Sequence, residues 1–392
     1  MKEFKGKAMP KTRQVSIKRN FKSPKKTFLQ LVLCFLGVLF QMTLAHHPVY
    51  AQQSRLKDLK QVLNQEKSWY SSPEAIRIAD NLLLYQHDNG GWDKNINMAA
   101  ALGVKEKNEI QSLKSSGETT IDNGATITQM RYLPLVYKAT GNEKYKAALL
   151  KGLDYLLEAQ YENGGWPQFY PIKKGYYEHI TFNDDAMMGV MRLLRDIAQG
   201  KPEYSFVDSQ RKTKAAKAIE KGLAVVLASQ IKVDGKLTAW CAQIDKNDLS
   251  PQKARAYELP SLSGGESVGI VEYLMEIDKP EPAVVKAVEA AMNWFDQVKI
   301  TGVKLIRKED PSLTKGFDLL LVKDPTAKPL WARFYGIKTN QPMFVGRDGI
   351  VHKQLSDIEY ERRVGYSYLV SSPNVLFDKL YPAWKNRWVV KK

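Results

Sequence analysis

Two short acidic segments carry the residue types from which a metal site can be built. One reads Asp122-Asn123 and the other contains Asp184-Asp185. No His or Cys is paired with them, so every ligand atom they offer is an oxygen. An all-oxygen set suits a hard cation such as Ca²⁺, and the pattern of a looped EF-hand is absent. We therefore expect Asp122, Asn123, Asp184 and Asp185 to hold Ca²⁺ between neighbouring helices.

Helix capping is a simpler role for the same residues. Asp and Asn cap helix N-termini, and acids in a first turn complement the helix dipole. Both segments precede periodic apolar stretches that read as helices, as does Glu266-Ser267. Capping would account for any one segment taken alone, whereas their recurrence on neighbouring helices favours a shared site.

Cations and two other side chains accompany the acidic segments. Lys94 closely follows Trp92, Arg255 lies in the loop before Glu266, and Arg333 lies in an aromatic segment. A metal and an arginine together could share the charge of a carboxylated ligand. Each cation alone is equally consistent with a solvated surface position. Trp92 suits a sugar platform or a packing wedge, and His179 suits a substrate contact.

A repeat positions these residues. Gln86 to Trp92 recurs as Gln160 to Trp166, with Asn-Gly-Gly-Trp at the end of both copies. Each copy follows an amphipathic helix, residues 73–86 and 145–160, and fainter copies of that helix lie at 217–230 and 284–297. Repeats at such a period indicate a helical array.

A second helix follows each of the first three turns. The connections before these second helices are long, while Lys138 to Glu143 is short, so the long loops fall on one rim. We expect a mainly α-helical fold, an incomplete α/α toroid with an inner and an outer ring. Residues 314–324 and 342–352 read as strands of small C-terminal elaborations.

The first 51 residues have the composition of an export signal. They hold ten of the 59 Lys and Arg residues but one of the 42 acids, and an apolar run from Phe28 to Leu44 precedes Ala51. The run is short for a membrane span and is interrupted by polar residues. Removing 51 of the 392 residues leaves 341 with a net charge of about +8 instead of +17. That surplus permits a polyanionic partner.

We therefore expect residues 1–51 to be a cleaved signal peptide and residues 52–392 to be one catalytic domain. The mature protein would be secreted or periplasmic, without a stable membrane anchor, and monomeric. Cys241 is its only cysteine, so no internal disulfide can form.

Four ordered motifs resemble pectate lyase of polysaccharide lyase family 10. They are Gly90-Gly91-Trp92-Asp93-Lys94-Asn95, Thr120-Ile121-Asp122-Asn123-Gly124-Ala125-Thr126, Thr181-Phe182-Asn183-Asp184-Asp185-Ala186-Met187 and Ala254-Arg255-Ala256-Tyr257-Glu258. The resemblance covers about residues 73–366. It implies a toroid-like α/α fold, Ca²⁺ dependence and cleavage of polygalacturonate by β-elimination, with no nucleic-acid partner.

The resemblance also implies roles for single residues. Asp122, Asn123 and Asp184 would hold or orient Ca²⁺, with Asp185 as a further candidate. Arg255 would be the base and Arg333 would bind substrate. We add Lys94, Asn95, Trp92 and His179 to the substrate-binding set. Asp93 stands where the family has proline, and Tyr368 where it commonly has tryptophan, which concerns details of the subsites.

Arginine is normally protonated, so a base at Arg255 would need neighbouring cations and would be favoured at alkaline pH.

Three other functions remain open at this stage. A terpenoid-cyclase-like toroid shares the Gln-x3-Gly-x-Trp spacing but requires an Asp-x-Asp-Asp acid motif, which is absent. A glycoside hydrolase could use Asp122 and Asp184 as an acid/base pair without a metal. A non-catalytic polyuronate-binding protein would keep Lys94 and Arg333 but would not need Arg255.

Overall fold

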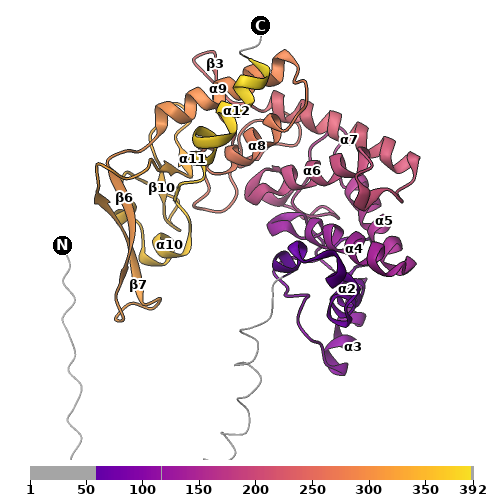
Figure 1. The fold of residues 1–392 in the computed structure, drawn as a ribbon. Coiled ribbons are helices and arrows are strands. Elements are labelled where there is room, and N and C mark those ends of the chain that lie inside the picture. The colour runs from indigo at the N-terminus through magenta and orange to yellow at the C-terminus, as the bar shows by residue number, and fades with distance from the viewer. Residues whose placement is uncertain (1–58, 116, 390–392) are drawn as a thin grey trace, which may run out of the picture. The chain divides into compact units, whose positions relative to one another are not determined.

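The chain is mainly helical in the computed structural model, which describes residues 59–115 and 117–389 (Figure 1). The predicted signal peptide lies outside the described residues. Those described belong to one unit, Lys57–Lys392. The helices are α2 (Pro73–Tyr85), α3 (Val104–Ser112), α4 (Ile127–Thr140), α5 (Glu143–Glu158), α6 (Ala186–Ala198), α7 (Ser209–Ala228), α8 (Glu266–Met275), α9 (Pro282–Val298), α10 (Tyr360–Gly365), α11 (Pro373–Val375) and α12 (Tyr381–Trp388).

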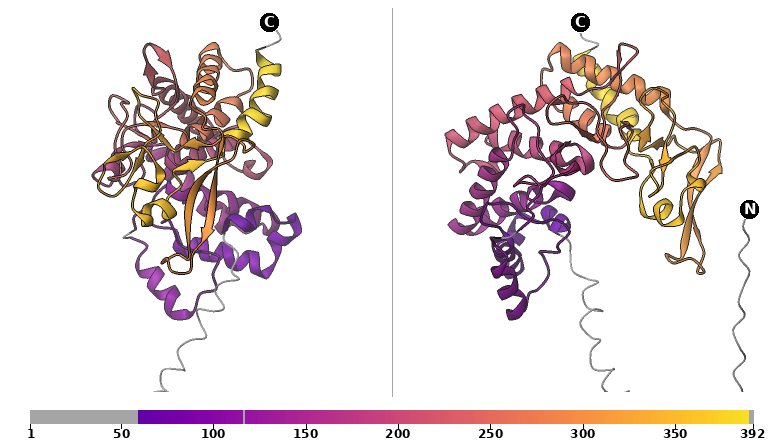
Figure 2. Two further views of the ribbon diagram at one scale, coloured as in Figure 1. Left: turned by 90° about the vertical axis from the view of Figure 1, so that its left-hand side faces the viewer. Right: turned by 180° about the vertical axis from the view of Figure 1, so that it is seen from behind.

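The long helices form two neighbouring rows. In one row α2, α5, α7 and α9 contact each other in succession, and in the other α4, α6 and α8 do so. The rows contact each other through the pairs α4–α5, α6–α7 and α8–α9, which Figure 2 shows from two further sides. The helix pairs predicted from the sequence are confirmed. The closure of the rows into an incomplete toroid stays a prediction.

Short polar segments set where these helices begin and end. The Ser72 hydroxyl caps α2 by accepting the Ala75 N–H at 3.2 Å. Helix α7 starts at Ser209 instead of the predicted Lys217, because Asp208 accepts the Arg211 N–H at 2.9 Å and caps a further stretch. That stretch is too polar for a helical period to be visible in the sequence.

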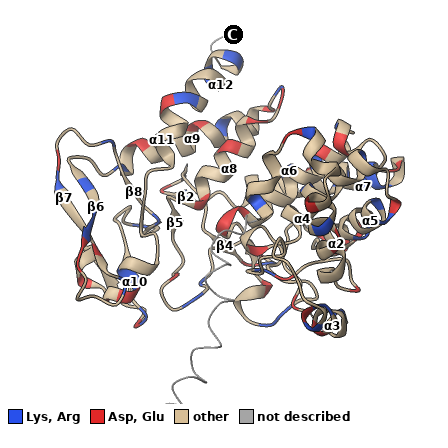
Figure 3. Ribbon diagram, turned by 60° about the horizontal axis from the view of Figure 1, so that its bottom comes forward, with Lys and Arg blue, Asp and Glu red and all other residues tan. Residues whose placement is uncertain are grey.

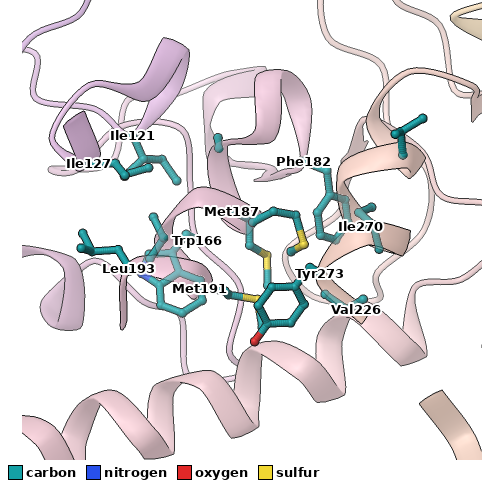
Figure 4. Close-up of a cluster of buried hydrophobic side chains, with 14 of the residues drawn as sticks. Ile121, Ile127, Trp166, Phe182, Met187, Met191, Leu193, Val226, Ile270 and Tyr273 are labelled. Atoms are coloured by element: carbon teal, nitrogen blue, oxygen red, sulfur yellow. The ribbon is translucent and has the colours of Figure 1, made fainter. Parts of the chain in front are cut away.

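The helices α4, α6 and α8 carry the centre of the core. Met187 and Met191 of α6 are fully buried. Figure 4 shows them between two aromatic side chains, Trp166 and the α8 residue Tyr273. Unbranched thioether side chains fill irregular gaps between helices well. This packing holds the N-terminal ends of α4, α6 and α8 near one another, where the acidic segments lie.

The tryptophans that end the two repeated turns are packing wedges. Trp92 is fully buried and its indole N–H donates to the Leu82 carbonyl at 2.8 Å. Trp166 is equally buried and donates to the Leu156 carbonyl at 2.8 Å. A ring without exposed surface cannot stack on a sugar. The assignment of Trp92 to substrate binding is therefore wrong, and core packing is the reason.

The strands are short and form two-stranded sheets. They are β1 (Ile180–Thr181), β2 (Lys232–Val233), β3 (Lys236–Leu237), β4 (Gln243–Ile244), β5 (Leu262–Ser263), β6 (Val303–Glu309), β7 (Phe317–Lys323), β8 (Trp331–Ala332), β9 (Phe334–Tyr335), β10 (Phe344–Val345), β11 (Val351–His352) and β12 (Leu369–Val370). The predicted strand at 314–324 is present as β7, which pairs antiparallel with β6. The stretch 342–352 contains only β10 and β11, which pair with each other.

No helix within residues 59–115 or 117–389 has both the length and the apolar character needed to cross a membrane.

Candidate active site

Two short turns place the acidic segments directly before α4 and α6. Asn123 lies in the 3₁₀ turn η4 (Asp122–Gly124) with φ 54°, and Asp184 lies in η6 (Asn183–Asp185) with φ 52°. Both values are left-handed, a conformation that Asn and Asp tolerate better than most residues. Neither α4 nor α6 has a side-chain capping bond at its start. Helix capping therefore does not explain these residues, and the turns η4 and η6 contact each other.

Asp122 is buried beneath a lysine. Its side chain is 5% exposed, and its Oδ2 accepts a hydrogen bond from the Lys94 ammonium. Its Oδ1 is buried without a protein partner. Close by, the Asn123 amide donates to the Asn95 Oδ1 at 2.9 Å. The first turn thus presents one carboxylate oxygen that no protein group satisfies.

Asp184 belongs to an ion-pair cluster around Arg333. The Arg333 Nη2 donates to Asp184 Oδ1 at 3.2 Å, to Asn183 Oδ1 at 3.1 Å and to Glu266 Oε1. Glu266 is the first residue of α8 and its side chain is 4% exposed. Burial alone would lower the pKa of Arg333, but Glu266, Tyr366 and Asp184 outweigh it and raise that pKa.

Backbone hydrogen bonds fix Arg333 through both its N–H and its carbonyl group. The residue lies between β8 and β9, where β8 pairs with β12 and β9 pairs with β5. Its own N–H donates to the Tyr368 carbonyl at 2.7 Å, and its carbonyl accepts the Gly264 N–H at 3.0 Å. The guanidinium is therefore held next to the start of α8 by the local sheet.

Asp185 points to a different partner. The Arg192 Nη1 donates to both of its carboxylate oxygens, at 3.1 and 2.9 Å. Burial, the largest influence, raises the pKa of Asp185 above its usual value. Both oxygens of Asp184 also accept, Oδ1 from Arg333 and Oδ2 from the Asn183 amide, so hydrogen bonding does not separate the two carboxylates. Asp184 is the better candidate for a metal ligand because it lines a cleft together with Asn123.

A cleft of about 680 Å³ connects the two turns. Its lining includes Lys94, Asn95, Asn123 and Asp184, and Asp184 also lines a smaller cleft of about 270 Å³ together with Arg333. A larger cleft, of about 900 Å³ between β2–β3 and α9, contains none of the predicted site residues. The types of the lining residues therefore locate the site better than the volume of the cleft does. Figure 3 colours the acidic and basic positions along the ribbon.

Arg255 is bound by a glutamate three residues later. Its Nε and Nη2 donate to the two carboxylate oxygens of Glu258, at 2.7 and 2.5 Å. This hydrogen bonding raises the pKa of Arg255. Burial would raise the pKa of Glu258, but its bonds to Arg255 outweigh burial and lower it. The direct partner of Arg255 is therefore a carboxylate, whereas a base at this position would need neighbouring cations.

Tyr366 connects the two arginines. The Arg255 Cζ lies 5.7 Å from its ring centre and the Arg333 Cζ lies 4.7 Å from it. The Tyr366 hydroxyl donates to Glu258 Oε1 at 2.8 Å. Arg255, Arg333 and Asp184 thus follow one another in a continuous set of contacts.

Comparison with known proteins decides the family. A family profile described as pectic acid lyase matches residues 86–377. The chain belongs to the pectic acid lyase family. The lyase is similar to two solved structures, the family 10 polysaccharide lyase from Cellvibrio cellulosa and a mutant of it in complex with trigalacturonic acid. Each is 34% identical with a TM-score of 0.69 and covers 83% of this chain, which in turn covers 96% and 98% of theirs. No curated protein matches.

The pectate lyase keeps most predicted site residues together, with two exceptions. Trp92 is in the core, as described above. His179 lies just before β1, beside the Glu178–Lys246 ion pair, and burial lowers its pKa. None of the contacts described for His179 reaches the cleft, so its role stays a prediction.

Sequence reasoning missed three members of the site. Glu258 and Tyr366 hold Arg255, and Glu266 holds Arg333. The spacing Arg255-x-x-Glu258 could have indicated the first pair, because residues three apart in a tight turn can pair. The contacts that Tyr366 and Glu266 make span more than 60 residues of sequence, and no local pattern announces them.

Proposed function

We propose that this pectate lyase is an exported, Ca²⁺-dependent enzyme that cleaves polygalacturonate by β-elimination, with Arg255 as the base. The observation that carries the proposal is the cleft in which Lys94, Asp184 and the neighbouring Arg333 combine cations with oxygen donors. A similar lyase has been solved with trigalacturonic acid, which supports a galacturonate chain as the substrate.

Substrate recognition is assigned to the cations of the cleft. A galacturonate chain carries one carboxylate on each sugar, and charge-assisted bonds from Lys and Arg recognise such groups well. Lys94 and Asn95 line the larger cleft and Arg333 the smaller one. We assign Lys94 and Arg333 to the carboxylates and Asn95 to a neutral polar contact.

The residues present fit a Ca²⁺ ion for which the protein supplies only some of the ligands. The buried Asp122 Oδ1 has no partner, and Asn123 of the same turn and Asp184 of the contacting turn η6 add further oxygens where they line the cleft. Among residues 59–115 and 117–389, no group of three His, Cys, Asp or Glu side chains comes together as a metal site. We therefore assign Asp122, Asn123 and Asp184 as ligands and expect the substrate to supply others. Bound there, Ca²⁺ would neutralise the substrate carboxylate and acidify the C5 proton.

Arg255 is assigned the proton transfer. In its neutral form it takes the C5 proton and becomes a guanidinium, while the C5–H electrons form the C4–C5 double bond. The C4–O4 bond then breaks, and O4 leaves with its electron pair and takes a proton from water. Arg255 returns its proton to the solvent. Since Glu258 raises the pKa of Arg255, the neutral form is scarce at neutral pH, and alkaline pH favours the reaction.

Ultraviolet absorbance of the unsaturated product tests the proposal. The mature protein should release the conjugated product from polygalacturonate with Ca²⁺ present and not with a chelator. Arg255→Ala should lose roughly 10² to 10⁴ in kcat, the usual worth of a positioned proton-transfer group, while still binding trigalacturonate. An alanine variant that keeps its kcat at saturating substrate would remove Arg255 from the proton transfer.

The same proposal includes export and oligomeric state. We expect cleavage after Ala51, so that N-terminal sequencing of the exported protein begins at Gln52, and a monomer by sedimentation. Retention of residues 1–51 in the exported protein would contradict the signal peptide.

A further inference from the structure

The turn that carries Arg255 is closed by one buried carboxylate. The Glu258 side chain is 8% exposed, while the Arg255 side chain is 43% exposed. Glu258 Oε2 accepts both the backbone N–H of Arg255, at 3.1 Å, and its Nε. The Glu258 N–H donates back to the Arg255 carbonyl at 2.9 Å. A carboxylate in this position fixes the backbone and the side chain of Arg255 together.

These bonds distinguish the three guanidinium nitrogens of Arg255. Nε and Nη2 donate to Glu258, whereas Nη1 has no hydrogen-bond partner anywhere in residues 59–115 and 117–389. A neutral guanidine has lost one proton, and the nitrogen that lost it carries the lone pair. Glu258 is an acceptor only, so the nitrogens that face it must keep their hydrogens. Nε has only one hydrogen, so it cannot carry the lone pair. The lone pair of a compatible neutral form lies on a terminal nitrogen, either Nη1 or the side of Nη2 that faces away from Glu258.

We propose that Glu258 is a positioning residue that keeps the basic lone pair of Arg255 on the terminal nitrogens, facing away from Glu258, and holds the guanidinium formed when Arg255 takes the C5 proton. This inference rests on the proposed role of Arg255 as the base. It assigns to Glu258 the part that a carboxylate plays behind a catalytic histidine, where it selects one tautomer and stabilises the charged product.

Two tyrosines complete the support of this pair. The Arg255 Cζ lies 5.0 Å from the Tyr257 ring centre and 5.7 Å from that of Tyr366. The Tyr366 hydroxyl donates to Glu258 Oε1, the oxygen that also accepts from Nη2. Because Tyr366 also lies against Arg333, the position of the base is tied to the arginine assigned to substrate binding. Nη1, which makes no hydrogen bond within residues 59–115 and 117–389, is then free to meet a sugar.

Glu258→Gln is the first test, since it keeps the shape of the side chain and removes the acceptor that faces Nε or Nη2. We expect kcat to fall by roughly 10²-fold, the order of loss for a misplaced reacting group. KM for polygalacturonate and the Ca²⁺ concentration for half-maximal rate should change less than about twofold, because Glu258 touches neither the metal ligands nor Lys94.

Asp154→Asn is the matched control. Asp154 accepts from the Nε and Nη2 of Arg211 in the same way, at 2.8 and 2.6 Å. The Asp154→Asn variant should keep the kcat and the KM of the wild type.

Guanidine rescue separates positioning from general damage. In Arg255→Gly, guanidinium chloride well below unfolding concentrations should occupy the vacated place and restore rate with saturation. In Arg255→Gly combined with Glu258→Gln, the restored rate should be at least roughly tenfold lower, because the carboxylate that captures the guanidine is gone. Combined with Asp154→Asn instead, rescue should be complete.

The outcomes distinguish the inference from the proposal on which it rests. If Glu258→Gln melts like the wild type and keeps its kcat, or if its loss appears in KM alone, Glu258 does not position the base. Equal rescue of the two double variants would overturn the inference as well. If Arg255→Gly itself keeps its kcat without guanidine, the base assignment fails instead.

Discussion

Lys94 and Arg333 each bind one of the carboxylates assigned to Ca²⁺. The Lys94 ammonium faces Asp122 and the Arg333 guanidinium faces Asp184. A metal ion entering the site must therefore compete with two protein cations for the same oxygens. Substrate carboxylates would relieve this competition, because they would offer the displaced cations a new partner. At the scale of single residues, metal and substrate binding should be coupled.

Lys94→Met tests this coupling. The variant should raise KM for polygalacturonate about tenfold, since a charge-assisted contact of about 1.5 kcal/mol is lost. It should also lower the Ca²⁺ concentration for half-maximal rate, because Asp122 Oδ2 is released. Steady-state rates measured over a matrix of both concentrations give both constants.

Lys60→Met is the matched control for Lys94→Met. Lys60 lines the same cleft, but none of its contacts involves Asp122. Its removal should leave the Ca²⁺ dependence unchanged. A parallel shift in both variants would mean that only the overall charge of the cleft matters.

Residue types and spacing could predict which side chains carry the chemistry but not their ion pairs. Asp122, Asp184, Lys94 and Arg333 were identifiable, because their motifs are local. Glu266 was visible as the start of a helix, yet its contact with Arg333 depends on β5 pairing with β9, which is a long-range event. The partner of Arg255 is local by contrast, since Glu258 lies three residues later, but the residue types alone did not reveal that the two bind each other.

The repeated turn brings neighbouring helices of one row, α2 with α5 and α5 with α7, into close backbone contact. Gly90 and Gly164 have φ values of 99° and 105°, and a Cβ at either would lie 2.4 Å from the backbone of Lys151 or Lys221. Only glycine permits both this conformation and this approach. The glycine that recurs in both copies of the turn is therefore a packing requirement.

Gly90→Ala and Gly164→Ala should each lower the free energy of unfolding by about 1–3 kcal/mol from the clash, beyond a further cost of roughly 1–2 kcal/mol for alanine at positive φ. Gly235→Ala is the control, because its φ is 75° but no atom lies within 4 Å of the added Cβ. Gly235→Ala should show only the cost of placing alanine at positive φ. Urea unfolding of the three variants measures the difference, and equal losses would exclude the helix contact as the cause.

The tryptophan of the same turn shows where sequence reasoning meets its limit at the scale of an element. A Trp at the end of a loop is compatible with a sugar platform, but the buried indole of Trp92 packs near Gly152 of α5. The sequence could predict the helix pairs, because each has an apolar period. It could not predict which side of the turn faces the core, since that is decided by the neighbouring helix.

Trp92→Ala should therefore reduce stability by about 3–5 kcal/mol, the usual cost of removing a buried aromatic side chain. Trp92→Phe should lose less and keep its KM for polygalacturonate. Urea unfolding and steady-state kinetics on the folded fraction provide both numbers. A KM raised tenfold in a stable Trp92→Phe protein would restore the substrate role.

At the scale of the whole molecule, each carboxylate of the candidate site has a cationic partner without a metal ion. Asp122 is paired with Lys94, whereas Asp184 and Glu266 share the single charge of Arg333, so the five groups keep one net negative charge. Each row of helices is joined by apolar packing that does not include these groups. The fold should therefore be independent of Ca²⁺, while the reaction should require it.

Chelation tests this separation. Extracellular sites of this kind bind Ca²⁺ with a Kd of about 10⁻⁴ to 10⁻³ M, so millimolar Ca²⁺ should support full activity and excess EDTA should abolish it reversibly. At ten times its Kd, a single ion stabilises the folded state by only about 1.4 kcal/mol. EDTA should therefore leave the helical circular dichroism unchanged and lower the melting temperature slightly. Asp122→Ala should need much more Ca²⁺ for half-maximal rate while keeping the same helical spectrum. Full activity in EDTA would remove the metal from the reaction, whereas loss of helix on chelation would make the ion part of the fold.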